Sequence, residues 1–232
     1  SFDAYTSIIT LAHIYVSQDP VRNPDDHSVT VFIKVGGNAL VDSTTKKSII
    51  SQVCELYHKG YRPVVIHGGG IEIQQLLDDV GIDSKFVGGH RKTDARSMRY
   101  VEMALSGFVN KELVGLLNQA GIRAVGISGK DAGMVKAKKR MHIEKGEEFD
   151  LGFVGDVDVV DTGLIQTLTQ TGYLPVISPV SMGRDGKSYN INADMFAGHL
   201  AGAMKADKFI ALTNIDGLLR DINNPDSLIK NL

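Results

Sequence analysis

Apolar residues in this chain fall into two kinds of segment that alternate along the sequence. Short, nearly continuous apolar runs predict buried strands, and the longer segments between them have apolar residues at every third or fourth position, which predicts helices. The runs are VFIKV (31–35), VVI (64–66), AVGIS (124–128), YLPVIS (173–178) and KFIALT (208–213). Strands alternating with helices are joined by right-handed crossovers, so we expect an α/β fold, a three-layer α/β/α sandwich around a mainly parallel central sheet.

The predicted helices have recognisable ends. They cover residues 42–60, 71–81 and 94–121; a fourth helix is capped at Asp161 or Thr162, and a last helix begins at Ala193 or Asp194. Asp42 or Ser43 suits the N-cap of the first helix, and Gly60 suits its C-terminal end. The long stretch over 94–121 is expected to break near Gly107, because glycine is a weak helix former.

The first residues of the chain differ from the rest. Residues 2–18 place Tyr5, Ile8 and Ala12 at helical spacing, and the QDPVRNPDDHS stretch that follows contains two prolines and a cluster of Asp and Asn residues, which is typical of a loop. We therefore expect an N-terminal helix and linker (1–29) followed by one α/β domain (30–232). The helix would pack either on this domain or on a partner subunit.

Composition excludes several classes of protein. Hydrophobic residues make up 43% of the chain and charged residues 22%, as in ordinary soluble globular proteins, and a net charge of -2 gives no reason to expect non-specific binding to nucleic acid. Cys54 is the one cysteine, so the chain has neither a disulfide framework nor a thiolate metal cluster. With no apolar run of membrane-spanning length and no secretory signal, we expect a cytoplasmic protein.

The stretch TVFIKVGGNAL (30–40) contains the first candidate chemistry. Lys34 lies inside an apolar strand, where its charge is costly unless an anion meets it. Gly36 and Gly37 follow the strand and allow the backbone to approach a ligand closely. Together these residues predict a phosphate site at the carboxyl edge of the sheet. The alternative is a lysine that extends to solvent beside an ordinary turn.

A second glycine turn follows the next strand. Gly68, Gly69 and Gly70 lie at the start of a helix, where successive backbone N–H groups form an anion-binding nest. His67, which precedes them, is interpreted as a structural hydrogen-bonding residue. Because the carboxyl ends of parallel strands share one edge, the two turns can hold a chain of phosphates between them. The spacing does not match a Walker A loop.

Two further segments offer polar groups. Arg91 has the planar fork that binds a carboxylate through two hydrogen bonds, although an arginine among glycines can also be a plain surface charge. The run Asn190, Asn192, Asp194 opens a helix, which N-capping by Asn192 or Asp194 would explain without any ligand.

A run of basic residues lies in a predicted β-hairpin over residues 134–154. We expect Lys136, Lys138, Lys139 and Arg140 to form its charged, solvated tip.

Eight ordered blocks in residues 31–232 carry a resemblance to a known family. They are FIKVGGNAL, VVIHGGG, GGHRKT, AVGISGKD, LGFVGDV, YLPVISPV, YNINAD and ALTNIDGLLRD. In this order they resemble the amino acid kinase family, and within it the members that phosphorylate N-acetyl-L-glutamate. The resemblance implies ATP-dependent phosphorylation of the side-chain carboxylate of N-acetyl-L-glutamate, which gives N-acetylglutamyl 5-phosphate in arginine biosynthesis.

The resemblance also implies roles for the matching residues. Lys34 corresponds to the lysine that stabilises the transferring phosphoryl group, and Asp194 to the aspartate that orients the catalytic lysines. Four residues correspond to contacts of the acetylated amino acid: Gly69, Gly70, Arg91 and Asn190. Eight correspond to contacts of the nucleotide: Gly36 and Gly37 at its phosphates, and Thr213, Asn214, Ile215, Asp216, Gly217 and Leu218 beside adenine and ribose.

Further expectations follow from the same resemblance. Because the acceptor carboxylate is already ionised, the reaction needs no general base, and Mg²⁺ would be held mainly by ATP oxygens rather than by protein residues. The assembly would be a homodimer, or a hexamer through the N-terminal helix. The family continues beyond this sequence with a glycine-rich segment and a second catalytic lysine, so we expect a truncated sequence that lacks the C-terminal part of the nucleotide site.

Two alternative functions stay open on the sequence alone. One is a related kinase of the same fold that acts on another carboxylate or on a carbamate. The other is a non-catalytic nucleotide-binding or regulatory subunit.

Overall fold

The computed structural model describes residues 29–144 and 146–212, together with residues 220, 221, 224, 227 and 229. The helix expected over residues 2–18 and the segment expected beside adenine, 213–218, lie outside the described residues. Among the described helices, none is long and apolar enough to cross a membrane.

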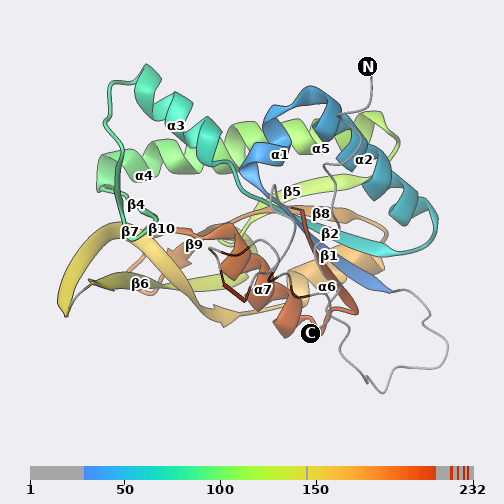
Figure 1. Cartoon of the computed structure of the whole chain (residues 1–232). Coiled ribbons are helices and arrows are strands. Elements are labelled where there is room, and N and C mark those ends of the chain that lie inside the picture. Colours follow the sequence, from blue (N-terminus) through green and yellow to red (C-terminus); the bar gives the residue numbers. More distant parts are fainter. Residues whose placement is uncertain are drawn as a thin grey trace.

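A five-stranded parallel sheet forms the centre of the molecule (Figure 1). Its order is β11-β1-β2-β8-β5, and every neighbouring pair runs parallel. The strands are β1 (Thr30–Val35), β2 (Arg62–His67), β5 (Ala124–Ser128), β8 (Leu174–Ser178) and β11 (Lys208–Leu212). They coincide with the five apolar runs, and all their carboxyl ends lie along one edge of the sheet. The predicted α/β/α sandwich is thus confirmed.

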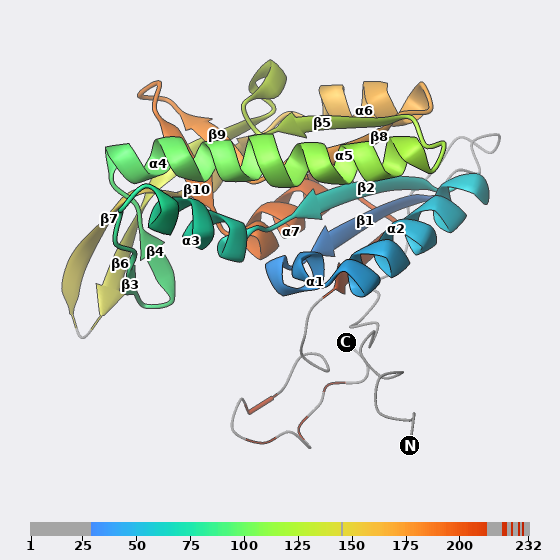
Figure 2. The same ribbon diagram turned by 90° about the horizontal axis from the view of Figure 1, so that it is seen from above.

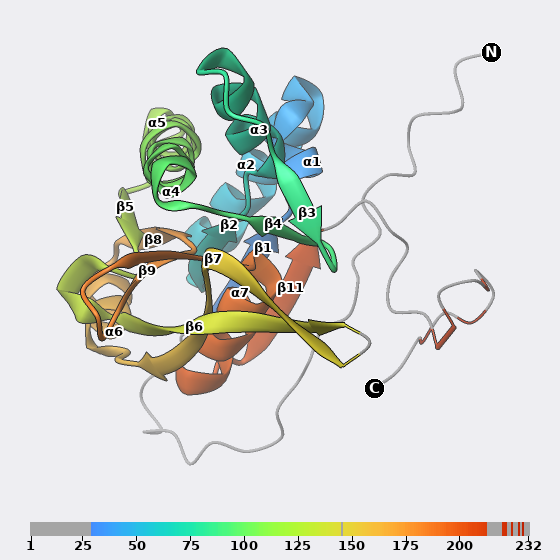
Figure 3. The same ribbon diagram turned by 90° about the vertical axis from the view of Figure 1, so that its left-hand side faces the viewer.

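Helices cover both faces of this sheet, as Figure 3 shows in end view. One face carries α1 (Gly37–Val41), α2 (Ser43–His58), α3 (Gly70–Asp79), α4 (Ala95–Glu102), the π-helix η1 (Met103–Val109) and α5 (Asn110–Gln119); the other carries α6 (Gly163–Gln170) and α7 (Ala193–Ala203). Alternate residues of β1 supply the two cores: Ile33 packs with α2 and α5, whereas Phe32 packs with α6 and α7. Burial on both faces explains why β1 reads as a continuous apolar run.

A second, smaller sheet was not predicted from the sequence. It joins β6 (Val135–Glu144), β7 (Glu147–Val160), β9 (Val180–Gly183) and β10 (Ser188–Ile191) in a closed ring. A short hairpin of β3 (Lys85–Val87) and β4 (His90–Lys92) packs against β7. A three-residue 3₁₀ turn, η2 (Asp131–Gly133), leads into β6.

The predicted charged hairpin tip is wrong in position. The hairpin is longer than its apolar pattern suggests, so the four basic residues lie within β6 and the chain turns only after Glu144. Two of these residues pair with carboxylates of β7: Lys139 lies 2.8 Å from Asp150, and Arg140 lies 2.6 Å from Asp156.

The long helical stretch that consists of α4, η1 and α5 was expected to break near Gly107, but it is continuous there. Figure 2 shows α4, η1 and α5 as one rod across the sheet, and Gly107 lies in the π-helical turn that joins its two α-helical parts. Asn110, the first residue after this turn, is buried, and its amide donates to the Val176 carbonyl of β8 at 2.9 Å. Gly126 of β5 leaves room for Asn110, because a Cβ there would lie 1.9 Å from its Oδ1.

Candidate active site

A cleft of about 270 Å³ opens at the carboxyl edge of the central sheet, between that sheet, the β3–β4 hairpin and β10. Seven of the expected site residues line it: Lys34, Gly36, Gly69, Gly70, Arg91, Asn190 and Asp194. They come from four separate segments of the chain, which the fold brings to one place. Gly37 begins α1 directly after Gly36, while Thr213, Asn214, Ile215, Asp216, Gly217 and Leu218 lie outside the described residues.

Lys34 and Asp194 form an ion pair inside this cleft. The Nζ of Lys34 lies 2.8 Å from Oδ1 of Asp194, and the lysine side chain is 9% exposed against 62% for the aspartate. Since Lys34 lies near the carboxyl end of the buried strand β1, between β2 and β11, its ammonium group requires an anionic neighbour, and Asp194 supplies one. The alternative in which Lys34 extends to solvent beside an ordinary turn is therefore wrong.

Helix α7 is capped by Asn192 and not by Asp194. The Asn192 side-chain oxygen accepts from the backbone N–H groups of Asp194 and Met195 at 3.0 and 3.1 Å. The carboxylate of Asp194 is thereby left available for Lys34. Its position in the first turn of α7 also favours a negative charge there.

The two glycine turns differ in what surrounds Gly36 and Gly69, the glycine described in each turn. Gly36 donates its N–H to the Leu212 carbonyl at 3.1 Å, which ties the end of β1 to β11. A Cβ on Gly36 would lie 3.5 Å from the Lys34 Nζ, so the absence of a side chain keeps the space beside that ammonium open. At Gly69, a Cβ would lie 2.8 Å from Leu105 and 3.2 Å from Val109, because α3 begins against η1.

His67 holds the second turn from behind. It is fully buried; its Nδ1 lies 2.9 Å from the Gly68 carbonyl oxygen, and its Nε2 lies 3.1 Å from the Asn110 side-chain nitrogen. A carbonyl only accepts, so Nδ1 is the protonated nitrogen and Nε2 accepts from Asn110. Burial, opposed by the Gly68 bond and reinforced by the Lys111 charge, lowers the pKa of His67 to about 4. The interpretation of His67 as a structural residue is confirmed.

Arg91 lines the same cleft from the β3–β4 hairpin and is not a plain surface charge. Its guanidinium is half-buried, lies 4.7 Å from the centre of the Phe86 ring, and donates to Gln74 at 2.7 Å and to the Gly70 carbonyl at 3.2 Å. It also donates to Ser84. Burial lowers the pKa of Arg91 from its ordinary value, which leaves it a cation that lacks part of its hydration.

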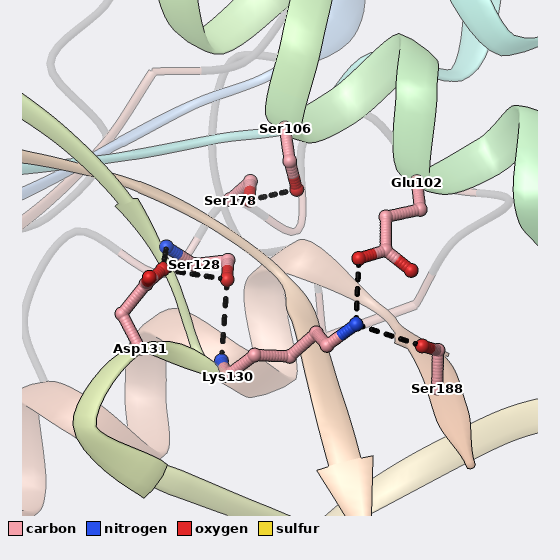
Figure 4. Close-up of polar contacts among 7 residues, drawn as sticks. All are labelled: Glu102, Ser106, Ser128, Lys130, Asp131, Ser178 and Ser188. Atoms are coloured by element: carbon pink, nitrogen blue, oxygen red, sulfur yellow. Dashed lines mark hydrogen bonds and ion pairs between the residues drawn. The ribbon is translucent and has the colours of Figure 1, made fainter.

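A polar cluster connects the turn after β5 to α4 and β10, as Figure 4 shows. Lys130 reaches from the turn after β5 to Glu102 of α4 at 2.7 Å and to Ser188 of β10 at 3.1 Å. Asp131 fixes this turn, because its carboxylate accepts from the backbone N–H and the hydroxyl of Ser128. The cluster joins α4 to the strand that bears Asn190.

Several cleft residues were not identified from the sequence. The lining also includes Ile73, Phe86, His90, Leu105, Val154 and Pro179. Phe86 lies on β3 and His90 on β4, on either side of the Gly88–Gly89 turn, so the position of that hairpin over the cleft would have identified them. The others are apolar residues that a pattern assigns to a core.

A family model described as "Amino acid kinase family" matches residues 29–232. This chain belongs to the amino acid kinase family.

Named relatives agree with this membership. The chain is 49% identical to the acetylglutamate kinase of Heliobacterium modesticaldum over 208 residues, which cover 88% of this chain and 70% of that protein. It is 46% identical to the acetylglutamate kinase of Caldanaerobacter subterraneus over 97% of this chain and 73% of that one. A crystal structure of smu.665 from Streptococcus mutans has a TM-score of 0.70 at 30% identity, covering 82% of this chain and 75% of its own.

Gly69 and Gly70 allow a matched test of packing in this amino acid kinase. Gly69→Ala places a methyl group against Leu105, and we expect it to lower the free energy of unfolding by about 1–3 kcal/mol, as overpacking does. Gly70→Ala meets no atom within 4 Å at the first position of α3 and is expected to be neutral or stabilising by about 0.5–1 kcal/mol. Urea unfolding measures both, and equal losses would contradict the clash at Gly69.

The buried imidazole of His67 makes the stability of this amino acid kinase depend on pH. The unfolded chain binds the proton near pH 6.5 and the folded one near pH 4, so stability is complete above pH 6.5 and falls as the pH decreases toward 4. The loss is at most about 3 kcal/mol, from 1.36 kcal/mol per pKa unit. The glutamine of His67→Gln does not titrate, so the unfolding free energy of this variant should fall less between pH 6.5 and 4. If the variant showed the same pH dependence as the wild type, His67 would not be its cause.

Proposed function

We propose that this chain is an acetylglutamate kinase, which transfers the γ-phosphoryl group of ATP to the side-chain carboxylate of N-acetyl-L-glutamate. The observation that carries the proposal is the Lys34–Asp194 ion pair, 2.8 Å long, in the cleft that Arg91 also lines. Relatives named acetylglutamate kinase, 44–49% identical over most of the chain, support this substrate within the family.

The chemistry requires positive charge more than proton transfer. At neutral pH the acceptor carboxylate is ionised, so it attacks phosphorus directly and no general base is required. Both reactants are anionic, and the enzyme must hold them in line and stabilise the charge on the moving phosphoryl group. In this proposal Lys34 supplies that stabilisation, and Asp194 keeps its ammonium group aimed into the cleft.

The opposite side of the cleft would bind the amino acid. Arg91 would hold the α-carboxylate of N-acetyl-L-glutamate with its planar fork, and Asn190 on β10 would bind near the other end of the substrate. Gly69 and Gly70 would let the acetylated substrate lie close to the backbone at the start of α3. The positions of these residues around one cleft support the arrangement.

The nucleotide would lie on the Lys34 side. Gly36 and Gly37 would face its phosphates, and Thr213–Leu218 would lie beside adenine and ribose. Asp194 is the one carboxylate in the described lining of the cleft, and Lys34 already pairs with it. A Mg²⁺ held mainly by phosphate oxygens and water suits such a lining, and the ion would neutralise charge on the phosphates.

We further propose a cytoplasmic homodimer. Met103 and Phe108 project from the π-helix η1 with 51% and 68% of their surfaces exposed, and a partner subunit would cover them. The alternative hexamer would depend on residues 2–18, which lie outside the described residues.

Replacing Lys34 tests the proposed mechanism. Lys34→Ala removes the group that stabilises the phosphoryl transfer, and we expect kcat to fall by about 10²–10³ or more. Asp194→Asn should also lower kcat, because it leaves a buried ammonium group without its anion. The measurement is formation of N-acetylglutamyl 5-phosphate from ATP.

The control replaces a comparable ion pair outside the cleft. Lys46→Ala breaks the 2.7 Å pair with Glu112 and is expected to leave kcat unchanged. Full activity of Lys34→Ala would refute the mechanism. A wild-type enzyme that phosphorylates glutamate, aspartate or carbamate in preference to N-acetyl-L-glutamate would favour a related kinase, and absence of both ATP binding and turnover would favour a non-catalytic subunit.

A further inference from the structure

The groups that Arg91 contacts directly in the described part of the chain are neutral, and Asp78 is a carboxylate that attracts it without forming an ion pair. Its guanidinium donates to the amide oxygen of Gln74, the hydroxyl of Ser84 and the carbonyl of Gly70, and it lies over the Phe86 ring. Within the described part of the chain, none of these contacts is with a carboxylate. Arg91 is therefore held by several hydrogen bonds while its charge stays unpaired.

An unpaired, half-buried guanidinium favours binding of an anion. Removal from water costs the charged group part of its solvation, and only a negative charge restores most of the loss. If a protein carboxylate supplied that charge, the incoming ligand would have to compete with it. Neutral acceptors orient the fork without such competition.

Gln74 is itself oriented by a second residue on α3. Its side-chain nitrogen donates to Asp78 Oδ1 at 2.7 Å, four residues along the helix. A carboxylate only accepts, so it selects the amide orientation that points the Gln74 oxygen toward Arg91. Asp78 thus acts on Arg91 in two ways, by orienting the neutral Gln74 amide and by a longer-range electrostatic attraction, and not as an ion-pair partner.

We infer that Gln74, backed by Asp78, is a positioning residue that fixes the Arg91 fork while leaving its charge for the α-carboxylate of the amino acid substrate. This inference rests on the proposed function. Gln74 orients the Arg91 guanidinium without neutralising it. A glutamate at the same place would accept the same hydrogen bond but would neutralise the cation.

The test compares two substitutions of Gln74 in the whole chain. Gln74→Glu keeps an acceptor but adds a charge, and we expect the KM for N-acetyl-L-glutamate to rise about tenfold or more while kcat and the KM for ATP change less than threefold. Gln74→Met removes the acceptor at similar volume, and a smaller rise in KM is expected because the fork loses one support and keeps its charge. Both substituents are good helix formers, so α3 should persist.

Two further variants separate positioning from general effects. Asp78→Asn weakens the hydrogen bond that holds the Gln74 amide and removes the nearby negative charge, while Arg91 still selects the same amide orientation, so it should raise the same KM by less than Gln74→Glu does. Gln52→Glu adds the same charge on the exposed face of α2, where Gln52 donates to Ser48, and it should leave every kinetic constant unchanged. Circular dichroism of each variant verifies that the fold is intact.

The outcomes distinguish the inference from the function on which it rests. An active wild-type enzyme whose Gln74→Glu variant keeps the wild-type KM for N-acetyl-L-glutamate would overturn the role of Gln74 alone. Equal changes in kcat and in the KM for ATP would also overturn it, since they indicate a general structural effect. A wild-type enzyme without activity on N-acetyl-L-glutamate would instead overturn the proposed function.

Discussion

A buried lysine is the constraint on which the rest of this site depends. Lys34 is buried near the carboxyl end of β1, in an apolar sheet, where a lone ammonium group would be strongly unfavourable. The fold meets this cost by placing the first turn of α7 beside the end of β1, so that Asp194 reaches the Lys34 Nζ. That arrangement depends in turn on Asn192, which caps α7 and leaves the carboxylate of Asp194 unused by the backbone.

The cleft combines two ways of handling positive charge. On one wall, Lys34 is paired with an exposed carboxylate, so its charge is partly balanced before any ligand arrives. On the other wall, Arg91 donates to neutral groups and has no ion-pair partner among the described residues, and only the more distant Asp78 attracts it. In the proposed reaction, the paired Lys34 suits the transferring phosphoryl group, whose charge changes during the reaction. Arg91 suits the α-carboxylate of the substrate, whose charge stays the same.

The sequence predicts the central sheet well because its inner strands β1, β2 and β8 are buried on both faces and the edge strands β5 and β11 are also apolar. It also predicts which residues gather at the cleft, since Lys34 and the glycine turns follow directly from strand ends. The second sheet was missed because β9 and β10 are four-residue strands, and β10 pairs in parallel with β7 from a distant part of the chain.

Some features of the site depend on contacts that no local pattern contains. Composition alone could not decide between Asn192 and Asp194 as the cap of α7, because both residue types serve as caps. The environment of Arg91 was equally hidden, since Gln74 and Ser84 lie 17 and 7 residues before it. From the sequence, Arg91 was either a carboxylate-binding residue or a plain surface charge. Only the contacts between α3 and the β3–β4 hairpin show that it is not a surface charge.

The wide turn at η1 has a mechanical consequence. One residue added to an α-helix rotates everything after it by about 100° about the axis. The rod that contains η1 can therefore present α4 to the strands β7 and β10 of the small sheet and α5 to β5 and β8 of the large one. Because kinks in helices concentrate at π-helical turns, any relative movement of the two sheets would bend the rod at η1.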